Sequence, residues 1–388
     1  MAIKILHIIS GLSTGGAEMM LYKLLLRLRE TNFDNSVVSM CPVGPIGEKI
    51  QALQVPVRTL GMRRKIPNPI GLYRLVRWLQ QDPPHLIQTW MYHADLLGGL
   101  AAKFVGGIPV VWNIRHGPFD KSGKRSSLWA MRACVPLSNW LPSRIICCSE
   151  VSQQIHIALG YPANRMIVIP NGFDLAAFKP DPEARLSVRR ELGLPSESLL
   201  IGLVGRFDTQ KDHQTFIEAA ARLQADSSHP YFVLCGDEVT WENDQLVSWI
   251  EAAGVHQRCH LLGRREDMPR LTAALDIATS SSSHGEAFSN VIGEAMACGV
   301  PCVATDVGDA AFIIGDTGRI VPPRDPYSLA QNWHALIEAG QEGRNRLGCA
   351  ARRRIAEHFN LPIVATRYEQ LYEQVSAPTP PFPQRVGT

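Results

Sequence analysis

The sequence of 388 residues lacks the marks of a secreted, metal-bound or membrane-spanning protein. Its nine cysteines include no C-x-x-C pair and no cluster with histidine at metal-ligand spacing, so we expect reduced thiols and no metal. No apolar run approaches the roughly 18 to 20 residues that span a bilayer. Residues 1–16 hold one lysine and no small-residue cleavage pattern, which indicates a first buried strand and not a signal peptide. These absences predict a cytoplasmic protein.

Charge is unevenly distributed along the chain. Residues 1–170 hold 19 basic and 8 acidic side chains, a net charge of +11, whereas the remainder holds 20 basic and 28 acidic side chains, a net charge of −8. A basic half of this size attracts anionic partners. Tryptophans next to basic clusters favour an anionic membrane surface over nucleic acid. A solvated basic face is the alternative. The clusters are Arg63-Arg64-Lys65, Arg74 and Arg77 with Trp78, and Lys121, Lys124 and Arg125 with Trp129.

Short apolar runs alternate with segments of helical periodicity along most of the chain, a pattern that predicts α/β domains with parallel, doubly wound sheets. The polar stretch from Lys179 to Pro195 separates two such series, so we expect domains at residues 1–178 and 179–361. A helix at 362–375 and a flexible, proline-rich tail at 376–388 follow. The predicted strands lie at 3–10, 35–40, 84–90, 109–114, 143–149 and 166–170, and then at 199–205, 231–237, 260–263, 275–281 and 301–305.

Two carboxylates, Glu286 and Glu294, are separated by seven residues across a predicted loop-to-helix junction. Ser289 and Asn290 are residues that favour an N-cap, and Gly299 before a proline is a stop signal. The first turn of such a helix offers N–H groups and a positive dipole end to a phosphate or a sugar hydroxyl. A carboxylate further along can accept hydrogen bonds from a ribose diol. The segment is therefore suited to bind a nucleotide sugar.

Five motifs in order resemble the retaining, GT-B-type glycosyltransferases of family 4, also called group 1. They are GLSTGGAE at 11–18, WNIRHG at 112–117, IPNGFD at 169–174, VGRFDTQKDH at 204–213 and the segment 280–306 with its E-x7-E pattern. Residues 89–103 and 315–326 further resemble the branch of bacterial O-antigen, capsule and exopolysaccharide synthesis. The resemblance implies two Rossmann-like domains facing across a cleft, with a C-terminal helix crossing back to the first domain. It makes the first domain the acceptor side and the second the nucleotide-sugar side.

The resemblance also implies roles for individual residues of the second domain. Arg206 and Lys211 would neutralise the donor diphosphate, since a planar fork and a mobile point charge suit adjacent phosphates. Glu294 would bind the ribose and Glu286 the hydroxyls of the donor sugar. Arg264 begins the loop expected to receive the nucleobase through backbone contacts. Backbone groups of Ala287, Phe288, Ser289 and Asn290 would complete the pocket.

The first domain would supply the opposite wall of the cleft. Gly15 and Gly16 would let backbone N–H groups approach the distal phosphate. His116 matches the family's active-site histidine, which orients the donor sugar and stabilises the departing phosphate. A set of weaker candidates would belong to acceptor recognition: His93, Asp95 and Arg115.

The activity that the resemblance implies is transfer of a sugar from a nucleoside diphosphate sugar to a hydroxyl of a glycan or lipid-diphosphate-linked glycan, with retention of configuration. UDP is the expected nucleotide and GDP the next. Because the sequence contains no D-x-D tripeptide, we expect neither metal nor other cofactor. Nucleic acid is not an expected partner, whereas the inner face of the cytoplasmic membrane is, through the basic half.

Alternatives remain at the level of sequence. A GT-B-fold isomerase or epimerase would use the same nucleotide contacts without an acceptor, and a non-enzymatic protein could use only the basic half. Two carboxylates flanking a glycosidic bond, as in glycosidases, are a competing explanation for Glu286 and Glu294. The chain also departs from the family pattern at Asp309, where a second glycine is common, and at Phe312, where a glutamate often follows. Both departures bear on donor choice.

Overall fold

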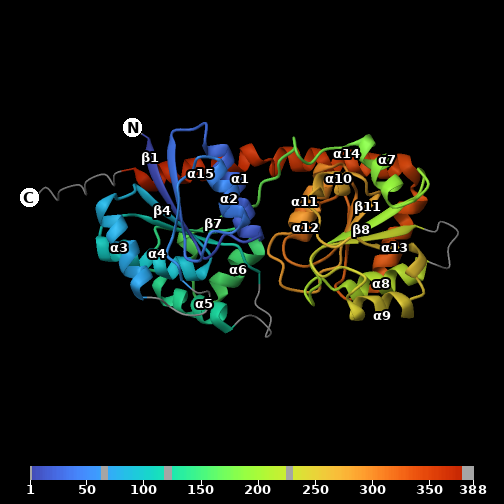
Figure 1. Ribbon diagram of the computed structural model, residues 1–388, viewed down its shortest axis with the longest axis horizontal. Coiled ribbons are helices and arrows are strands. Elements are labelled where there is room, and N and C mark those ends of the chain that lie inside the picture. The colour runs from blue at the N-terminus through green and yellow to red at the C-terminus, as the bar shows by residue number, and fades with distance from the viewer. Residues whose placement is uncertain (1, 63–68, 118–124, 224–229, 378–388) are drawn as a thin grey trace, which may run out of the picture.

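The computed structural model describes residues 2–62, 69–117, 125–223 and 230–377, which form two α/β domains side by side (Figure 1). The predicted basic residues at 63–65, 121 and 124, and most of the predicted tail, lie outside the described residues. Each domain has one sheet, and every recorded pair of neighbouring strands in both sheets is parallel.

The first domain is built on a seven-stranded sheet of order β3-β2-β1-β4-β5-β6-β7. All five residues of β4 and of β5 are buried, as expected for central parallel strands with helices on both faces. The strands are β1 Ile3–Ile9, β2 Phe33–Ser39, β3 Val57–Thr59, β4 Leu86–Trp90, β5 Val110–Ile114, β6 Arg144–Cys147 and β7 Met166–Val168. The helices are α1 Gly16–Leu28, α2 Pro45–Ala52, α3 Pro69–Gln81, α4 Tyr92–Val105, α5 Arg125–Leu137 and α6 Glu150–Ala158, with a short 3-10 turn at Ala163–Arg165.

The second domain repeats this plan with a six-stranded sheet of order β10-β9-β8-β11-β12-β13. Its strands are β8 Leu200–Val204, β9 Tyr231–Cys235, β10 Cys259–Leu261, β11 Ile277–Ser280, β12 Cys302–Thr305 and β13 Arg319–Val321. Its helices are α7 Pro182–Glu191, α8 His213–Arg222, α9 Asp244–Ala252, α10 Met268–Ala273, α11 Asn290–Ala297, α12 Ala310–Ile314 and α13 Pro326–Glu338, with a 3-10 turn at His256–Arg258.

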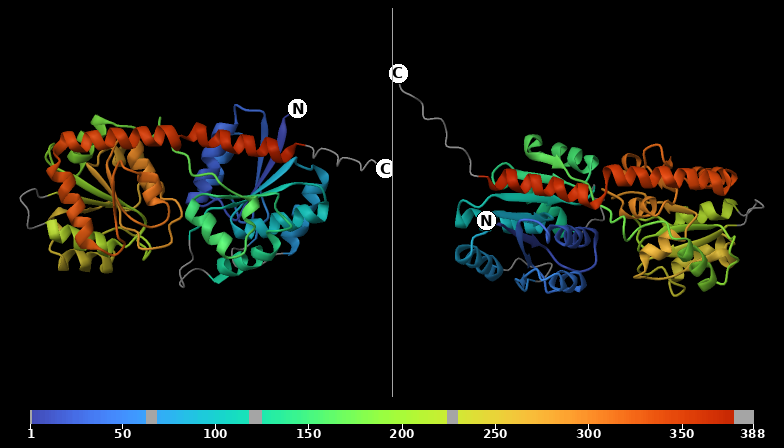
Figure 2. Two further views of the ribbon diagram at one scale, coloured as in Figure 1. Left: turned by 180° about the vertical axis from the view of Figure 1, so that it is seen from behind. Right: turned by 90° about the horizontal axis from the view of Figure 1, so that it is seen from above.

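Two helices at the end of the described chain connect the domains. Helix α14, Gly340–His358, packs on the second domain, and α15, Leu361–Ser376, continues along the first domain (Figures 1 and 2). Val364, Tyr368 and Tyr372 of α15 are fully buried and belong to the same core as β1 and α1. The predicted return of the chain to the first domain is confirmed. No helix in the described part of the chain has both the length and the apolar character that crossing a membrane requires.

Two edge strands, β3 and β13, were not predicted. Each has only three residues, and β13 begins with an exposed arginine. Strands β7 and β10 are equally short but belong to longer runs that the sequence shows, whereas β3 and β13 each include an arginine and are defined only by pairing with β2 and with β12. These two strands each add one strand at the edge of a predicted sheet, and the doubly wound arrangement remains as predicted.

Asp95 is a buried charge-bearing group in the first domain, fully enclosed in the first turn of α4. Its Oδ1 accepts a hydrogen bond from the Thr89 hydroxyl at the end of β4, with an O–O distance of 2.5 Å. Burial raises the pKa of Asp95 to about 7, although the hydrogen bonds from Thr89 and the Asn113 backbone favour the charged form. The folded protein therefore holds a proton on Asp95 at a pH where the unfolded chain has lost it.

This difference predicts a pH effect on stability. Because the folded pKa is raised, the contribution of Asp95 to stability is fully present below about pH 4 and is lost as pH rises towards 7. Asp95→Asn should flatten this dependence, since an amide does not titrate. Thermal unfolding of both proteins between pH 5 and 8 should show a smaller fall of Tm in the variant. Parallel Tm curves would contradict the assignment.

Candidate active site

A cleft with a volume of about 490 Å³ lies between the two domains. Ligands of open α/β sheets bind beyond the carboxyl ends of the strands, and the cleft is lined from both sides by segments that follow strands. From the first domain come Ser10, Gly16, Glu18, His93, Arg115 and His116, and from the second Arg206, Gln210, Lys211, Glu286, Phe288 and Asn290. Most of the predicted site residues thus meet in one cavity, although they come from widely separated parts of the chain.

Lys211 and Glu286 form a largely buried ion pair in the wall of the second domain. The Lys211 ammonium donates a hydrogen bond to Glu286 Oε1, and the side chains are 16% and 12% exposed. The Ser282 hydroxyl donates to the same carboxylate oxygen over 2.9 Å. Burial alone would raise the pKa of Glu286, but Lys211, Ser282 and Arg206 together lower it below its ordinary value. Glu286 is therefore a fixed anion beside a fixed cation at the cleft.

Arg206 follows β8 and has a different environment. Its side chain is 56% exposed, and its Nε donates to Asp208 Oδ2 over 3.1 Å. A weaker contact joins its Nη2 to Gln210 Oε1 at 3.4 Å. Asp208 and Gln210 thus orient the guanidinium and leave much of it accessible. The accessible guanidinium of Arg206 and the ammonium of Lys211 line the same cleft, and together they can bind two adjacent phosphates.

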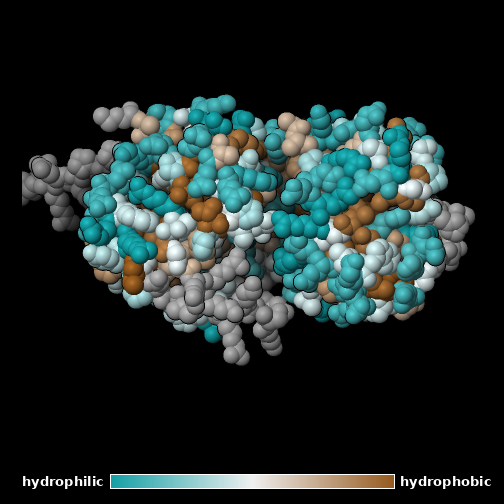
Figure 3. All heavy atoms as spheres, viewed as in Figure 1, coloured by the Kyte–Doolittle hydropathy of each residue, from teal (hydrophilic) through white to brown (hydrophobic). Residues whose placement is uncertain are grey.

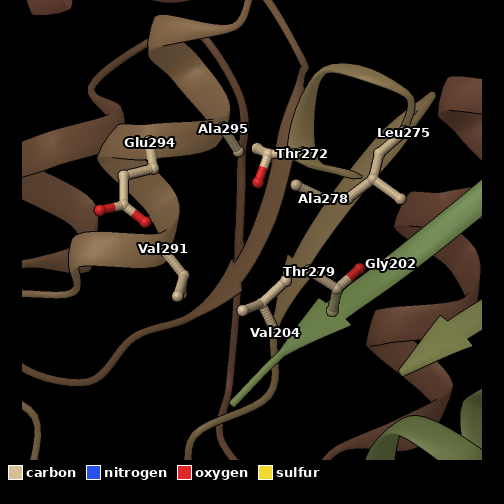
Figure 4. Close-up of a pocket in the computed structure, with 9 residues that line it drawn as sticks. All are labelled: Gly202, Val204, Thr272, Leu275, Ala278, Thr279, Val291, Glu294 and Ala295. Atoms are coloured by element: carbon tan, nitrogen blue, oxygen red, sulfur yellow. The ribbon is translucent and has the colours of Figure 1, made fainter. Parts of the chain in front are cut away.

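Glu294 does not line the main cleft but lies in a small cavity next to it. It lines a small cavity of about 10 Å³ with Val204 and Val291, which also line the main cleft (Figure 4). In Figure 4, Glu294 and Val291 extend from successive turns of α11, and Val291 points towards Val204. Glu294 Oε1 is 3.6 Å from the ammonium of Lys23 on α1, in the other domain. Burial raises the pKa of Glu294, and Lys23 only partly offsets this effect.

The start of α11 agrees with the prediction in position and differs in its cap. Ser289 is the N-cap residue in extended conformation, but its hydroxyl makes no cap bond and is buried without a recorded partner. The side chain of Asn290 accepts a hydrogen bond from Asn171 Nδ2 over 2.6 Å, and both residues line the cleft. Ala287 and Phe288 also line the cleft and are buried. Ser289 itself is not among the lining residues.

The glycine turn and His116 form the wall of the first domain. Gly15 is the N-cap residue of α1, and Gly16 lines the cleft opposite Asn290. His116 follows β5, and its Nδ1 is 2.9 Å from the carbonyl oxygen of Gly117. Since a carbonyl oxygen can only accept, Nδ1 carries the proton in this hydrogen bond. A Cβ on Gly117 would lie 2.4 Å from the carbonyl oxygen of Glu286, so the two walls touch here.

The three predicted acceptor contacts have different positions. His93 and Arg115 line the cleft, and burial lowers the pKa of His93. Arg115 Nη1 donates to the Tyr368 hydroxyl on α15 over 3.1 Å, and its guanidinium carbon lies over the Trp90 ring, 5.5 Å from the ring centre. Asp95 is enclosed in the core and is not among the lining residues. Its position corrects the prediction of a substrate contact, because its carboxylate is bonded to Thr89 inside the fold.

Arg264 contacts the glycine turn of the first domain from the loop that follows β10. Its Nη2 donates to the Thr14 hydroxyl of the first domain over 3.0 Å, and its Nε is 3.9 Å from Asp237. It is not among the lining residues, although its loop follows β10 as predicted. In this arrangement Arg264 joins the two domains.

The sequence did not identify four residues that help to build the site, namely Lys23, Asn171, Gln210 and Ser282. Asn171, Gln210 and Ser282 lie inside the motifs given above, which is a usable signal, whereas Lys23 is recognisable only through its contact with Glu294. Among the described residues, no group of three or more His, Cys, Asp and Glu side chains could hold a metal ion.

Two family models match the chain. "Glycosyltransferase Family 4" matches residues 14–177, and "Glycosyl transferases group 1" matches residues 198–339. The chain is 28% identical over 336 residues to the UDP-Gal:alpha-D-GlcNAc-diphosphoundecaprenol alpha-1,3-galactosyltransferase of Escherichia coli, covering 84% of each chain.

Solved structures agree with these matches. Anabaena HepE in complex with UDP superposes with a TM-score of 0.84 and 25% identity, over 96% of this chain and all of that one. HepE in complex with UDP-glucose gives a TM-score of 0.82 at the same identity and coverage. The two matched domains, their order and the GT-B arrangement around a shared cleft show that this chain is an enzyme of the group 1, family 4 glycosyltransferases.

Proposed function

We propose that the protein transfers a sugar from a UDP-sugar to a hydroxyl of a glycan or lipid-diphosphate-linked glycan in bacterial surface polysaccharide synthesis, with retention of configuration. The observation that carries this proposal is the accessible Arg206 beside the Lys211–Glu286 pair on one wall of the cleft. The UDP complexes of HepE and the UDP-galactose and diphosphoundecaprenol substrates named for the E. coli relative support the same donor and acceptor classes.

The diphosphate would lie between Arg206 and Lys211. As the bond from the anomeric carbon to the diphosphate oxygen breaks, its electron pair moves onto that oxygen, and two cations stabilise the growing charge. Lys211 is already held by Glu286, so little reorganisation is needed when the ligand binds. Glu286, ionised and fixed, would accept hydrogen bonds from the hydroxyls of the donor sugar.

Retention follows if the acceptor attacks from the face that the diphosphate leaves. The acceptor oxygen then forms the new bond to the anomeric carbon, and its proton passes to the departing phosphate oxygen. His116, at the end of β5 on the opposite wall, would orient the sugar while the walls exclude water. No nucleophile from the protein is required. The stereochemical test is an NMR comparison of the anomeric configuration in donor and product, where inversion would contradict the proposal.

The acceptor would reach the cleft from an anionic membrane surface. Four large apolar side chains of the first domain are between 60% and 68% exposed: Ile70 and Tyr73 on α3, Phe104 on α4 and Trp129 on α5. Exposed Arg74, Arg77, Lys103 and Arg132 lie on the same three helices. The face seen in Figure 3 shows scattered hydrophobic residues among mainly hydrophilic ones. Apolar and basic side chains together suit an interface with anionic lipid.

Arg206→Ala and Lys211→Ala test the diphosphate site. Each removes a charge-assisted contact of about 1.5–3 kcal/mol, so the Kd for UDP should rise about 10- to 150-fold. Titration calorimetry in EDTA measures this, with uridine as the ligand that lacks phosphates. Uridine affinity should stay unchanged. Arg222→Ala, which removes an exposed arginine of α8, is the control. If a variant lost affinity for UDP and for uridine to the same extent, the substituted residue would not bind the phosphates.

Glu294→Gln tests the ribose contact. The wild-type protein should prefer UDP over 2′-deoxy-UDP by about tenfold or more, because a carboxylate accepts from the diol. The variant should lose most of this preference, which calorimetry with both ligands measures. Glu338→Gln, at an exposed site on α13, should keep it. The same ratio in wild type and Glu294→Gln would show that Glu294 does not contact the diol.

Vesicle flotation tests the membrane surface. The wild-type protein should float with vesicles containing anionic lipid at low salt, and less with neutral vesicles or at high salt. Charge reversal of Arg74 and Arg77 to Glu should reduce flotation strongly. Reversal of Arg190 and Arg222, which are exposed on the second domain, should have little effect. Equal flotation with neutral and anionic vesicles would overturn this part of the proposal.

A further inference from the structure

Asp309, one of the two departures from the family pattern, joins the two domains beside the cleft. It precedes α12 in the second domain, yet its carboxylate contacts the first domain. Its Oδ2 accepts a hydrogen bond from the backbone N–H of Glu150 over 2.9 Å, and its Oδ1 accepts one from Val151 over 3.1 Å. Asp309 is only 3% exposed, so this carboxylate is buried between the domains.

The two N–H groups belong to the first turn of α6. That turn also has a cap from its own domain, because the Ser149 hydroxyl accepts from the N–H of Ser152 over 3.0 Å. Asp309 satisfies two further donors that a helix leaves unpaired and places a negative charge at the positive end of the helix. Because these bonds join different domains, their energy stabilises the arrangement of the two domains relative to each other and not either domain alone.

The backbone at Asp309 supports the loop that carries Glu286. The N–H of Asp309 donates to the carbonyl oxygen of Ala287 over 3.0 Å. Gly308 has a φ of +63° and lies so close to this loop that a Cβ on it would be 2.5 Å from the carbonyl oxygen of Glu286. Asp309 therefore forms hydrogen bonds with both walls of the cleft: its backbone amide bonds the loop of Glu286 and Ala287, and its carboxylate bonds the first domain.

Helix α6 continues this connection to the opposite wall. The hydroxyl of Ser152, in the first turn of α6, donates to the carbonyl oxygen of His116 over 2.9 Å. A continuous set of hydrogen bonds thus runs from His116 through Ser152 and the start of α6 to Asp309, and from there to Ala287. The bonds join the two walls that would enclose the donor sugar.

We propose that Asp309 is a positioning residue for the transfer reaction, which sets the distance between the His116 wall and the Glu286 loop by capping α6 from the other domain. This inference rests on the proposed function of the cleft. The Asp309 carboxylate is not among the residues that line the cleft, so it would act through the position of the two walls and not through a contact with substrate. A substitution of Asp309 should therefore change kcat and not the affinity for the nucleotide, which would be bound by the second domain.

The test compares Asp309→Ala and Asp309→Asn with Asp325→Ala. Asp325 caps α13 in the second domain with the same chemistry, its Oδ1 accepting from the N–H of Ser328 over 3.0 Å. Loss of a helix cap corresponds to about a 2- to 30-fold change in an equilibrium. We expect kcat of Asp309→Ala to fall by such a factor, with a UDP Kd within about twofold of wild type. Asp309→Asn, which keeps one acceptor oxygen, should be intermediate.

A second measurement does not depend on turnover. Small-angle scattering of the unliganded protein and of its UDP complex should give a larger radius of gyration for Asp309→Ala than for wild type and Asp325→Ala. Melting temperatures identify any variant that fails to fold. Equal kcat and equal radius in wild type and Asp309→Ala would overturn the proposal. If wild type bound no nucleotide, the proposed function would fail, whereas scattering of the unliganded proteins would still decide whether Asp309 holds the domains together.

Discussion

The relative position of the two domains depends on a pair of backbone hydrogen bonds at Phe173. The N–H of Phe173 donates to the carbonyl oxygen of Phe359 over 2.8 Å, and its carbonyl oxygen accepts from Leu361 over 2.9 Å. These bonds join the segment that leaves the first domain to the junction of α14 and α15, where the chain returns. The two segments that connect the domains are therefore hydrogen-bonded to each other. This junction restricts how the domains, and with them the two walls of the cleft, can move relative to each other.

The same junction is packed against the helix that carries Glu294. The ring of Phe173 stacks on Phe288 with centroids 6.1 Å apart and covers Gly293, where a Cβ would lie 2.0 Å from the ring. Only a residue without a side chain fits at position 293. Lys23 lies 5.9 Å from the centre of the same ring while pairing with Glu294. The junction, α11 and α1 thus form one packed unit behind the cleft.

Most of the fold could be predicted from the sequence, because the central strands are apolar runs between helical segments and because α11 has clear start and stop signals. The edge strands β3 and β13 could not, since each is a three-residue segment that includes an arginine and so does not form an apolar run. At the site, Lys211 and Glu286 could be assigned to one wall through their motifs. The partners of Glu294 and Asp309 could not, because Lys23 and the start of α6 are distant in sequence and meet them only through the domain arrangement.

The opposite charges of the two parts of the chain have a mechanical consequence. With +11 on residues 1–170 and −8 on the rest, most of which forms the second domain while α15 packs on the first, the two charges are separated along the long axis and give the molecule a permanent electric dipole in that direction. A charged surface therefore exerts a torque on it as well as an attraction. At physiological salt, screening limits this torque to about 8 Å from the surface. The molecule would rotate within the last nanometre of its approach, so its orientation would be selected only just before contact.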